Sequence, residues 1–178
     1  VAAPAAECKS WPEAATLEDA LQNNPPPQTE VLTMEDFRHA RAELNTASAS
    51  DLDLIVLGSP HFSLPEFEQL IPMLQNRRRH DRLRFLVTTS RAVQLLCQQK
   101  GYADMLKDFG GEITVDTCIL TSPMLNDSTK RIMTNSAKYA WYTPGLLNAE
   151  IAFGSLKDCV DSAVSGKIEI DEALWQQV

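Results

Sequence analysis

The fold is decided by residues 51–63, which read DLDLIVLGSPHFS. Four consecutive apolar residues at 54–57 end at Gly58, which is typical of a strand that is buried on both faces. The Ser63-x-x-Glu66 spacing that follows predicts a helix from there to about residue 76, because the two side chains can cap its first turn. A buried strand that leads into a capped helix is the beginning of a parallel βαβ unit.

The same alternation continues toward the end of the chain. Further strands are expected at 84–88, 112–115, 130–133 and 150–153, and further helices at 92–99 and 155–164. Strands that alternate with helices of this length predict an α/β domain of three layers. Its mostly parallel sheet would be covered by helices on both faces.

The first 50 residues lack this alternation. Thr-x-x-Asp spacings predict a short helix over 16–22 and a longer one over 33–45, and three prolines at 25–27 separate the two. We therefore divide the chain into an N-terminal arm and helix at 1–50 and an α/β domain at 51–178.

Composition excludes several classes of protein. The net charge of −8 argues against general nucleic-acid binding, which depends on neutralising phosphates. No apolar run approaches the ~18–20 residues that span a membrane. The four cysteines are sparse and irregularly spaced, so reduced thiols and a cytoplasmic location are expected, with metal binding left open. The start at Val1 is not an intact signal peptide, and we expect either processing or a longer product.

Candidate site residues follow from the fold, because ligands of parallel sheets bind outside the carboxyl ends of the strands. The loops expected there carry Ser59 and His61, then Ser90 and Arg91, then Cys118, and finally Thr134, Asn135, Ser136 and Lys138. Hydroxyls and helix N-termini donate to oxygen atoms, and a guanidinium can grip a carboxylate, so this set suits a small carboxylate. Glycine-rich nucleotide motifs and Cys-x-x-Cys pairs are absent.

Each candidate also has a structural alternative. Ser90 and Ser136 can be ordinary helix N-caps, and Cys118 can be a small buried hydrophobe. His61 can be a core histidine and Arg91 a surface residue. Two further features are interpreted as structural only. They are Cys97, in an apolar helix stripe, and the basic run at 77–84, which would be a solvated helix end.

Several segments resemble the aconitase X family of putative hydro-lyases. They are WPEAATLE at 11–18, GSPHFS at 58–63, TSR at 89–91, GG at 110–111 with DTC at 116–118, MTNSAKYA at 133–140 with PG at 144–145, and GSLKDCV at 154–160. The MTNSAKY block is specific, and the segments follow the family order over nearly the whole chain. Because the family's catalytic domain is much longer, this chain resembles its C-terminal portion, with an aconitase-like domain.

The resemblance implies dehydration of a small hydroxy acid, such as cis-3-hydroxyproline or mevalonate 5-phosphate. It implies an iron–sulfur cluster (4Fe-4S or 2Fe-2S) as Lewis acid. Cys118 would be the first cluster ligand and Cys159 the next, with a third thiolate from elsewhere. The catalytic residues would be His61, Ser136 and Lys138, and the substrate-binding residues Ser59, Ser90, Arg91, Thr134 and Asn135. At Ser59 the family often has Cys.

The resemblance also implies partners. A chain or segment carrying the N-terminal half of the catalytic domain would complete the enzyme, together with a small swivelling domain, and the arm at 1–50 would pack on that segment. Two alternatives stay open. One is a metal-independent, diverged lyase or isomerase of a biosynthetic pathway, and the other is a non-catalytic subunit that stabilises an active partner.

Overall fold

A computed structural model describes residues 24–25, 28–59, 61–126 and 128–176. The chain divides into two units, Val1–Thr33 and Met34–Val178. The described residues of the first unit contain no helix or strand, and the helix expected over 16–22 lies outside the described residues. All helices and strands below belong to the second unit.

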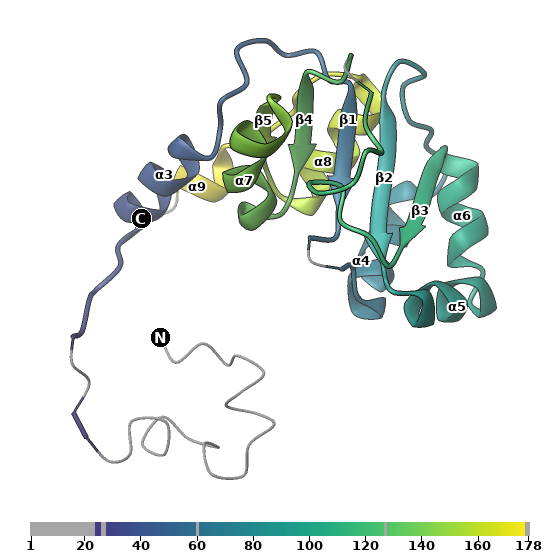
Figure 1. Cartoon of the computed structure of the whole chain (residues 1–178), viewed down its shortest axis with the longest axis horizontal. Helices are drawn as coiled ribbons and strands as arrows, with labels where there is room; N and C mark the ends of the chain where they lie inside the picture. The colour runs from purple at the N-terminus through teal and green to yellow at the C-terminus, as the bar shows by residue number, and fades with distance from the viewer. Residues whose placement is uncertain (1–23, 26–27, 60, 127, 177–178) are drawn as a thin grey trace. The chain divides into compact units, whose positions relative to one another are not determined.

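A five-stranded sheet forms the centre of the second unit (Figure 1). Its strands are β1 (Leu54–Leu57), β2 (Arg84–Thr89), β3 (Gly111–Val115), β4 (Arg131–Thr134) and β5 (Glu150–Phe153). They lie in the order β3-β2-β1-β4-β5, and every neighbouring pair is parallel. The predicted parallel α/β fold is therefore confirmed.

The two faces of the sheet are covered unequally. The helices are α3 (Met34–Glu43), α4 (Leu64–Leu74), α5 (Arg91–Gln99), α6 (Tyr102–Phe109), α7 (Ala137–Leu147), α8 (Leu156–Ser165) and α9 (Ala173–Gln176). One face packs against α4, α5, α6 and α8. The other packs against α7 and the loop at 116–130, so its layer contains one long helix.

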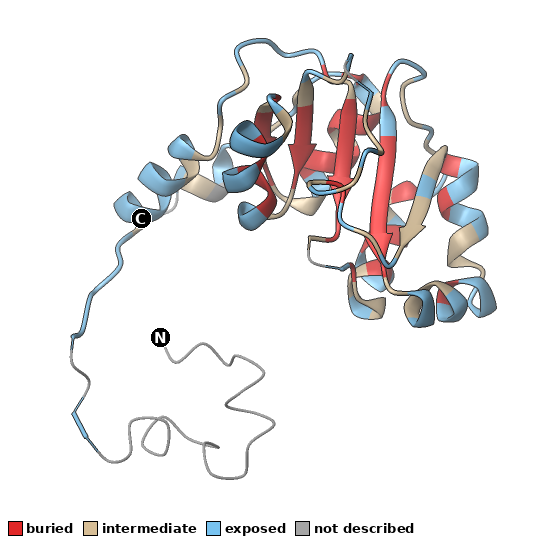
Figure 2. Ribbon diagram, viewed as in Figure 1, coloured by how far each residue is buried: buried red, intermediate tan, exposed pale blue. Residues whose placement is uncertain are grey.

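Strand β1 shows why the sheet is buried on both sides. Ile55 and Leu57 point into the core beneath α4 and α8, whereas Leu54 and Val56 point into the core beneath α7. This alternation is the two-residue period of a strand, and all four side chains are buried. Figure 2 shows the same burial along the central strands.

Three helices, α6, α7 and α9, were given no range from the sequence, although Ser136 was considered as a helix N-cap. Helix α6 lies between Gly101 and Gly110, which adopt left-handed conformations with φ of 74° and 96° and allow the chain to turn at each end. Helix α7 contains Pro144, which is rare inside a helix and hid its pattern. Among the described residues, no helix is long and apolar enough to cross a membrane.

The basic run at 77–84 differs from the solvated helix end that we expected. The Arg79 guanidinium donates hydrogen bonds to the carbonyl oxygens of Gly110 (2.7 Å), Leu83 (2.7 Å) and His80 (3.0 Å). Arg84 forms an ion pair with Glu112 at 2.9 Å. These arginines tie together the segments that enter β2 and β3, at the amino edge of the sheet.

Candidate active site

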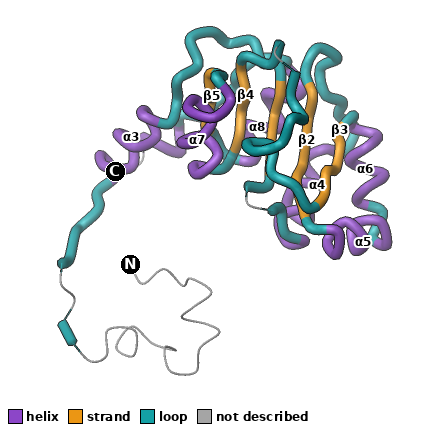
Figure 3. The backbone as a smooth tube through the Cα atoms, in the orientation of Figure 1, coloured by secondary structure: helices purple, strands orange, loops and turns teal. Residues whose placement is uncertain are grey.

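The strand order places a crevice between β1 and β4. The chain adds strands on one side of β1 and then returns to add β4 and β5 on the other, so the loops that follow β1 and β4 leave in opposite directions (Figure 3). Ligands of open α/β sheets bind at such a switch point. A cavity of about 290 Å³ lies there, lined by Gly58, Ser59, His61, Glu66, Asn135 and Ser136.

A second cavity adjoins the first at the same edge. Its volume is about 550 Å³, and it is lined by Ser59, His61, Asp116, Thr117, Cys118, Leu120 and Lys138. Ser59 and His61 line both cavities, so the two adjoin at these residues. The predicted residues from the loops after β1, β3 and β4 therefore meet at this edge.

The loop that carries Ser59 and His61 is held by the end of β2. Gly58 has a φ of +88°, and a Cβ there would lie 2.2 Å from the Thr88 carbonyl oxygen. The Thr88 hydroxyl donates to the Gly58 carbonyl oxygen, and the Phe62 amide donates to the Thr88 carbonyl oxygen at 2.8 Å. The loop position thus depends on close backbone contact that a side chain at Gly58 would prevent.

A second pair of contacts fixes the same loop. The Thr89 hydroxyl donates to the Phe62 carbonyl oxygen at 2.6 Å, and both residues are buried. The Phe62 ring packs edge-on against Phe67, with ring centroids 5.1 Å apart. His61 is exposed next to Phe62, and it lines both cavities.

Ser136 joins the β1 and β4 sides of the crevice. Its hydroxyl accepts the Tyr139 amide at 3.2 Å, which caps α7, and donates to the Ser59 carbonyl oxygen at 2.9 Å. Thr134 is fully buried, and its hydroxyl oxygen accepts the Ser136 amide at 3.2 Å. The N-cap alternative for Ser136 is confirmed, and the catalytic role stays a prediction.

Ser90 and Arg91 line neither cavity. Ser90 caps α5 by accepting the Val93 amide at 3.2 Å. The Arg91 side chain is 80% exposed, and its Nε lies 3.1 Å from an Asp116 carboxylate oxygen. Because Asp116 lines the larger cavity, Arg91 borders the site through this ion pair. Its predicted contact with a substrate carboxylate stays untested.

The cysteines lie in different environments. Cys118 is exposed and lines the larger cavity. Cys159 belongs to α8 and is fully buried on the side of the helix that faces the core, and burial raises the pKa of its thiol. Cys97 is also buried in that core, as its structural interpretation requires.

The described residues supply only part of an iron–sulfur cluster site. Iron–sulfur clusters are usually held by four cysteine thiolates. Within the described ranges, no three His, Cys, Asp or Glu side chains lie close enough to hold a metal ion. Cys118 fits one ligand position, and a complete set would need residues from outside the described part of this chain.

Two acidic residues that line the cavities were not among the predicted site residues. Asp116 directly follows β3, so the rule that selected Cys118 could have found it. Glu66 lines the smaller cavity, but its carboxylate accepts the Ser63 amide at 2.7 Å and the Ser63 hydroxyl at 2.6 Å. Glu66 is therefore occupied by the predicted capping box.

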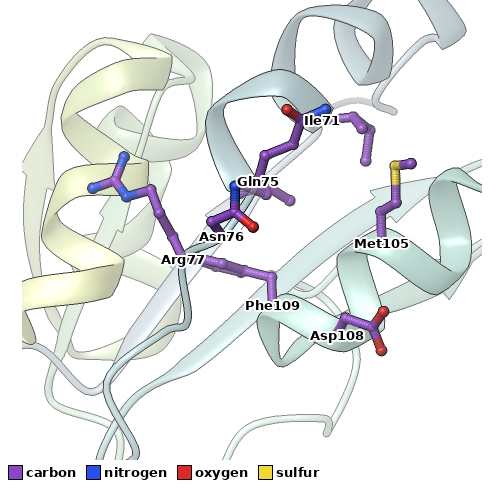
Figure 4. A pocket seen from close by; sticks show the side chains of 8 residues that line it. Ile71, Gln75, Asn76, Arg77, Met105, Asp108 and Phe109 are labelled. Carbon is purple, nitrogen blue, oxygen red and sulfur yellow. The ribbon is translucent and has the colours of Figure 1, made fainter.

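A further cavity lies at the opposite, amino edge. Figure 4 shows it between the ends of α4 and α6, with a volume of about 480 Å³. It is lined by Ile71, Leu74, Gln75, Asn76, Arg77, Met105, Asp108 and Phe109. Arg77 is paired with Asp161 at 2.6 Å, and none of the candidate residues reaches this edge. We therefore assign the candidate active site to the carboxyl edge.

An open parallel sheet with a polar crevice at its switch point defines an α/β protein with a small-molecule site. The family profile described as aconitase X third domain matches residues 52–165. The chain belongs to the aconitase X family, as the resemblance implied.

Similar proteins fall into two groups of dehydratases. The chain is 37% identical over 166 residues to cis-3-hydroxy-L-proline dehydratase of Pseudomonas aeruginosa, covering 92% of this chain and 29% of that protein. It is 40% identical over 158 residues to the Hypocrea jecorina protein of the same name (87% and 26%). It is 32% identical over 125 residues to the phosphomevalonate dehydratase large subunit of Methanocaldococcus jannaschii (70% and 30%).

A solved structure supports the same fold. Aconitase X of Thermococcus kodakaraensis, in its holo form, superposes with a TM-score of 0.69 and 25% sequence identity. The match covers 79% of this chain and 36% of that one. The chain thus spans less than a third of the length of the three dehydratases above.

Proposed function

We propose that this chain is part of a hydro-lyase of the aconitase X type that removes water from a small hydroxy carboxylic acid. One observation carries the proposal. His61, Ser59 and Lys138 line one cavity at the switch point, inside the segment that matches the family. The named relatives, which are dehydratases, supply the reaction class.

The chemistry of the crevice favours a cis-3-hydroxyproline-like substrate over one like phosphomevalonate. A phosphate group needs several positive charges or hydrogen-bond donors. Among the described lining residues Lys138 is the one ammonium, and the nearby Arg91 is paired with Asp116. The match to the hydroxyproline dehydratases also covers more of this chain, 92% against 70%.

The chain's residues would hold the substrate by its carboxylate. The Lys138 ammonium attracts the negative charge, and the Asn135 amide and Ser59 hydroxyl donate hydrogen bonds at the start of α7, where the helix dipole favours an anion. The His61 imidazole would accept the proton from the carbon beside the carboxylate as the hydroxyl leaves the next carbon. The C–H and C–O bonds break and a C=C bond forms, and the proton taken up by His61 would pass to the departing hydroxide, so that one water leaves and the imidazole is restored.

An iron–sulfur cluster is part of the proposal. Cys118 would contribute one thiolate at the crevice, with the remaining ligands from outside this chain. When bound, such a cluster supplies a Lewis-acidic iron for the departing hydroxyl. We infer that the missing portion belongs to a partner chain or segment with the N-terminal half of the catalytic domain and a small swivelling domain.

The test uses a chimera of the Pseudomonas aeruginosa dehydratase in which this chain replaces the matched portion. We expect the purified chimera to dehydrate cis-3-hydroxy-L-proline. His61→Gln should lower kcat on the order of 100- to 10,000-fold, which is the usual contribution of a general base. His39→Gln is the matched control, because His39 is exposed on α3 and away from the crevice.

Three outcomes would contradict parts of the proposal. A folded chimera that is inactive on hydroxy acids would refute the reaction and favour a non-catalytic subunit. Full activity of His61→Gln would remove His61 from the proton transfer. Unchanged iron content in Cys118→Ser, measured on protein prepared without oxygen, would remove Cys118 from the cluster, since a hydroxyl is a poor substitute for a thiolate.

A further inference from the structure

Helix α7 carries apolar side chains on two faces, and only one of these faces is covered by residues that the structure describes. Tyr139, Ala140 and Thr143 are buried against the sheet. On the outer face, Trp141 is 65% exposed, Leu146 is 56% exposed and Tyr142 is 48% exposed. Exposed tryptophan and tyrosine are enriched where proteins bind one another, because one ring buries a large area at little entropic cost.

The outer face is open as well as apolar. At helical spacing, Lys138, Trp141, Tyr142, Gly145 and Leu146 share one side of α7. A Cβ built on Gly145 would meet no atom within 4 Å, so the centre of this side is uncovered. We call these five residues the α7 face.

The layer arrangement points to the same place. Among the described residues, four helices pack on the opposite side of the sheet, whereas this side is covered by α7, by the loop residues 116–126 and 128–130, and by Leu44 just after α3 (Figure 1). Parallel sheets are normally buried under helices on both faces. The thin layer is therefore where additional protein has room to pack.

The α7 face is continuous with the candidate active site. Lys138 belongs to this face and also lines the larger cavity. A second exposed apolar group lies on α5 and α6, formed by Leu95, Leu96 and Met105. It contains no aromatic residue and none of its members lines a carboxyl-edge cavity, so the observations favour α7.

We propose that the α7 face docks the remainder of the dehydratase catalytic chain, through an apolar surface on that remainder. This rests on the proposed function, because the occupant is the part of the enzyme that the 178 residues do not contain. The chain covers 29% of the Pseudomonas aeruginosa relative and 36% of the solved aconitase X chain, so most of such an enzyme is available to cover this side. Docking there would place the added segment beside the crevice, where the proposed iron–sulfur cluster needs further thiolate ligands.

Hydroxyl-radical footprinting tests the docking directly. The oxidation rates of Trp141 and Leu146 are compared between the 178-residue chain alone and the Pseudomonas aeruginosa chimera. We expect both rates to fall about tenfold or more in the chimera, as for residues at the centre of a desolvated interface. Leu95 and Leu96 on α5 are the internal control, and their rates should change less than about twofold, as at rim or free surface.

Substitution gives a second measurement. In the 178-residue chain, Trp141→Ser with Leu146→Ser should abolish co-purification with the unmatched part of the Pseudomonas aeruginosa protein. Leu95→Ser with Leu96→Ser should leave it unchanged. All four side chains are exposed, so neither pair should alter the circular dichroism of the chain.

Several results would overturn the proposal. One is an equal oxidation rate of Trp141 in the chain and in the chimera. Another is co-purification that survives in the Trp141→Ser, Leu146→Ser variant. A third is protection of Trp141 in the chain alone that increases with the concentration of the chain. The last result would assign the face to a second copy of this chain. Footprinting measures burial and does not depend on catalysis. A chimera in which Trp141 is protected but hydroxy acids are not dehydrated would therefore refute the proposed function and leave the docking proposal standing.

Discussion

Gly58 lies in the loop that carries His61, and substituting it with alanine adds both conformational strain and a steric clash. The same substitution at two glycines elsewhere in the chain separates these two effects. At Gly145 the backbone has no positive φ, and a Cβ would meet nothing within 4 Å. Gly145→Ala should stabilise the chain by roughly 0.5–1 kcal/mol, because alanine is the better helix former. At Gly101 a φ of +74° adds strain, again with nothing within 4 Å. Gly101→Ala should therefore destabilise by about 1–2 kcal/mol.

Gly58→Ala adds a clash to the same strain. Its φ is +88°, and the new Cβ would lie 2.2 Å from the Thr88 carbonyl oxygen and 2.8 Å from the Phe62 nitrogen. Relief of this contact breaks the hydrogen bond from the Phe62 amide to the Thr88 carbonyl oxygen, which costs about 1–3 kcal/mol when a buried partner is left unsatisfied. With the left-handed strain, we expect a total loss of about 2–5 kcal/mol.

The assay is urea unfolding of the 178-residue chain, followed by circular dichroism, with the free energy of unfolding extrapolated to water. The order of stability should be Gly145→Ala, wild type, Gly101→Ala and Gly58→Ala. The reasoning fails if Gly58→Ala is as stable as Gly101→Ala within about 0.5 kcal/mol, which is typical of a harmless surface change. That result would mean that the loop is not held by close contact with β2.

Three further predictions concern other contacts. Arg79→Lys should lower the free energy of unfolding by about 2–3 kcal/mol, because an ammonium cannot replace the planar guanidinium that donates to several carbonyl oxygens. An unchanged free energy of unfolding would refute the stabilising role of these hydrogen bonds. Thr89→Val leaves the buried Phe62 carbonyl oxygen unsatisfied and should cost about 1–3 kcal/mol in the same assay. The Arg84 hydrogen bond lowers the pKa of Glu112, so the unfolded chain takes up protons first as pH falls below the ordinary Glu value of about 4.3. The free energy of unfolding should therefore decline as the pH falls below this value, and the decline should be smaller in Glu112→Gln.

Much of the sheet could be predicted from the sequence, because its strands are short apolar runs that end at Gly, Thr or Asp. The runs at 54–57 and 84–88 specify buried parallel strands, and Ser63 and Ser155 mark helix starts by capping boxes that the structure contains. Ser136 marked a possible start of α7, but the extent of this helix could not be predicted, because Pro144 and the apolar outer face remove the usual amphipathic signal.

The candidate site was predictable to the level of loops but not of contacts. The rule that ligands bind at carboxyl ends selected His61, Cys118 and Lys138, which line the larger cavity. It could not show that Arg91 would pair with Asp116, or that Cys159 would lie in the core, because both depend on long-range packing. Residue types in a loop do not reveal which partner each side chain will find.

The Ser136 hydroxyl makes two bonds that belong to different parts of the molecule. It holds the first turn of α7 through the Tyr139 amide and the β1 loop through the Ser59 carbonyl oxygen. A ligand that shifts the Ser59 backbone therefore also perturbs the start of α7. Coupling between two binding equilibria is reciprocal. If a partner moves this turn of α7 when it binds, it changes the affinity of the crevice for its ligand by a certain factor. The ligand then changes the affinity of the chain for the partner by the same factor. One hydroxyl can thus link substrate binding to assembly.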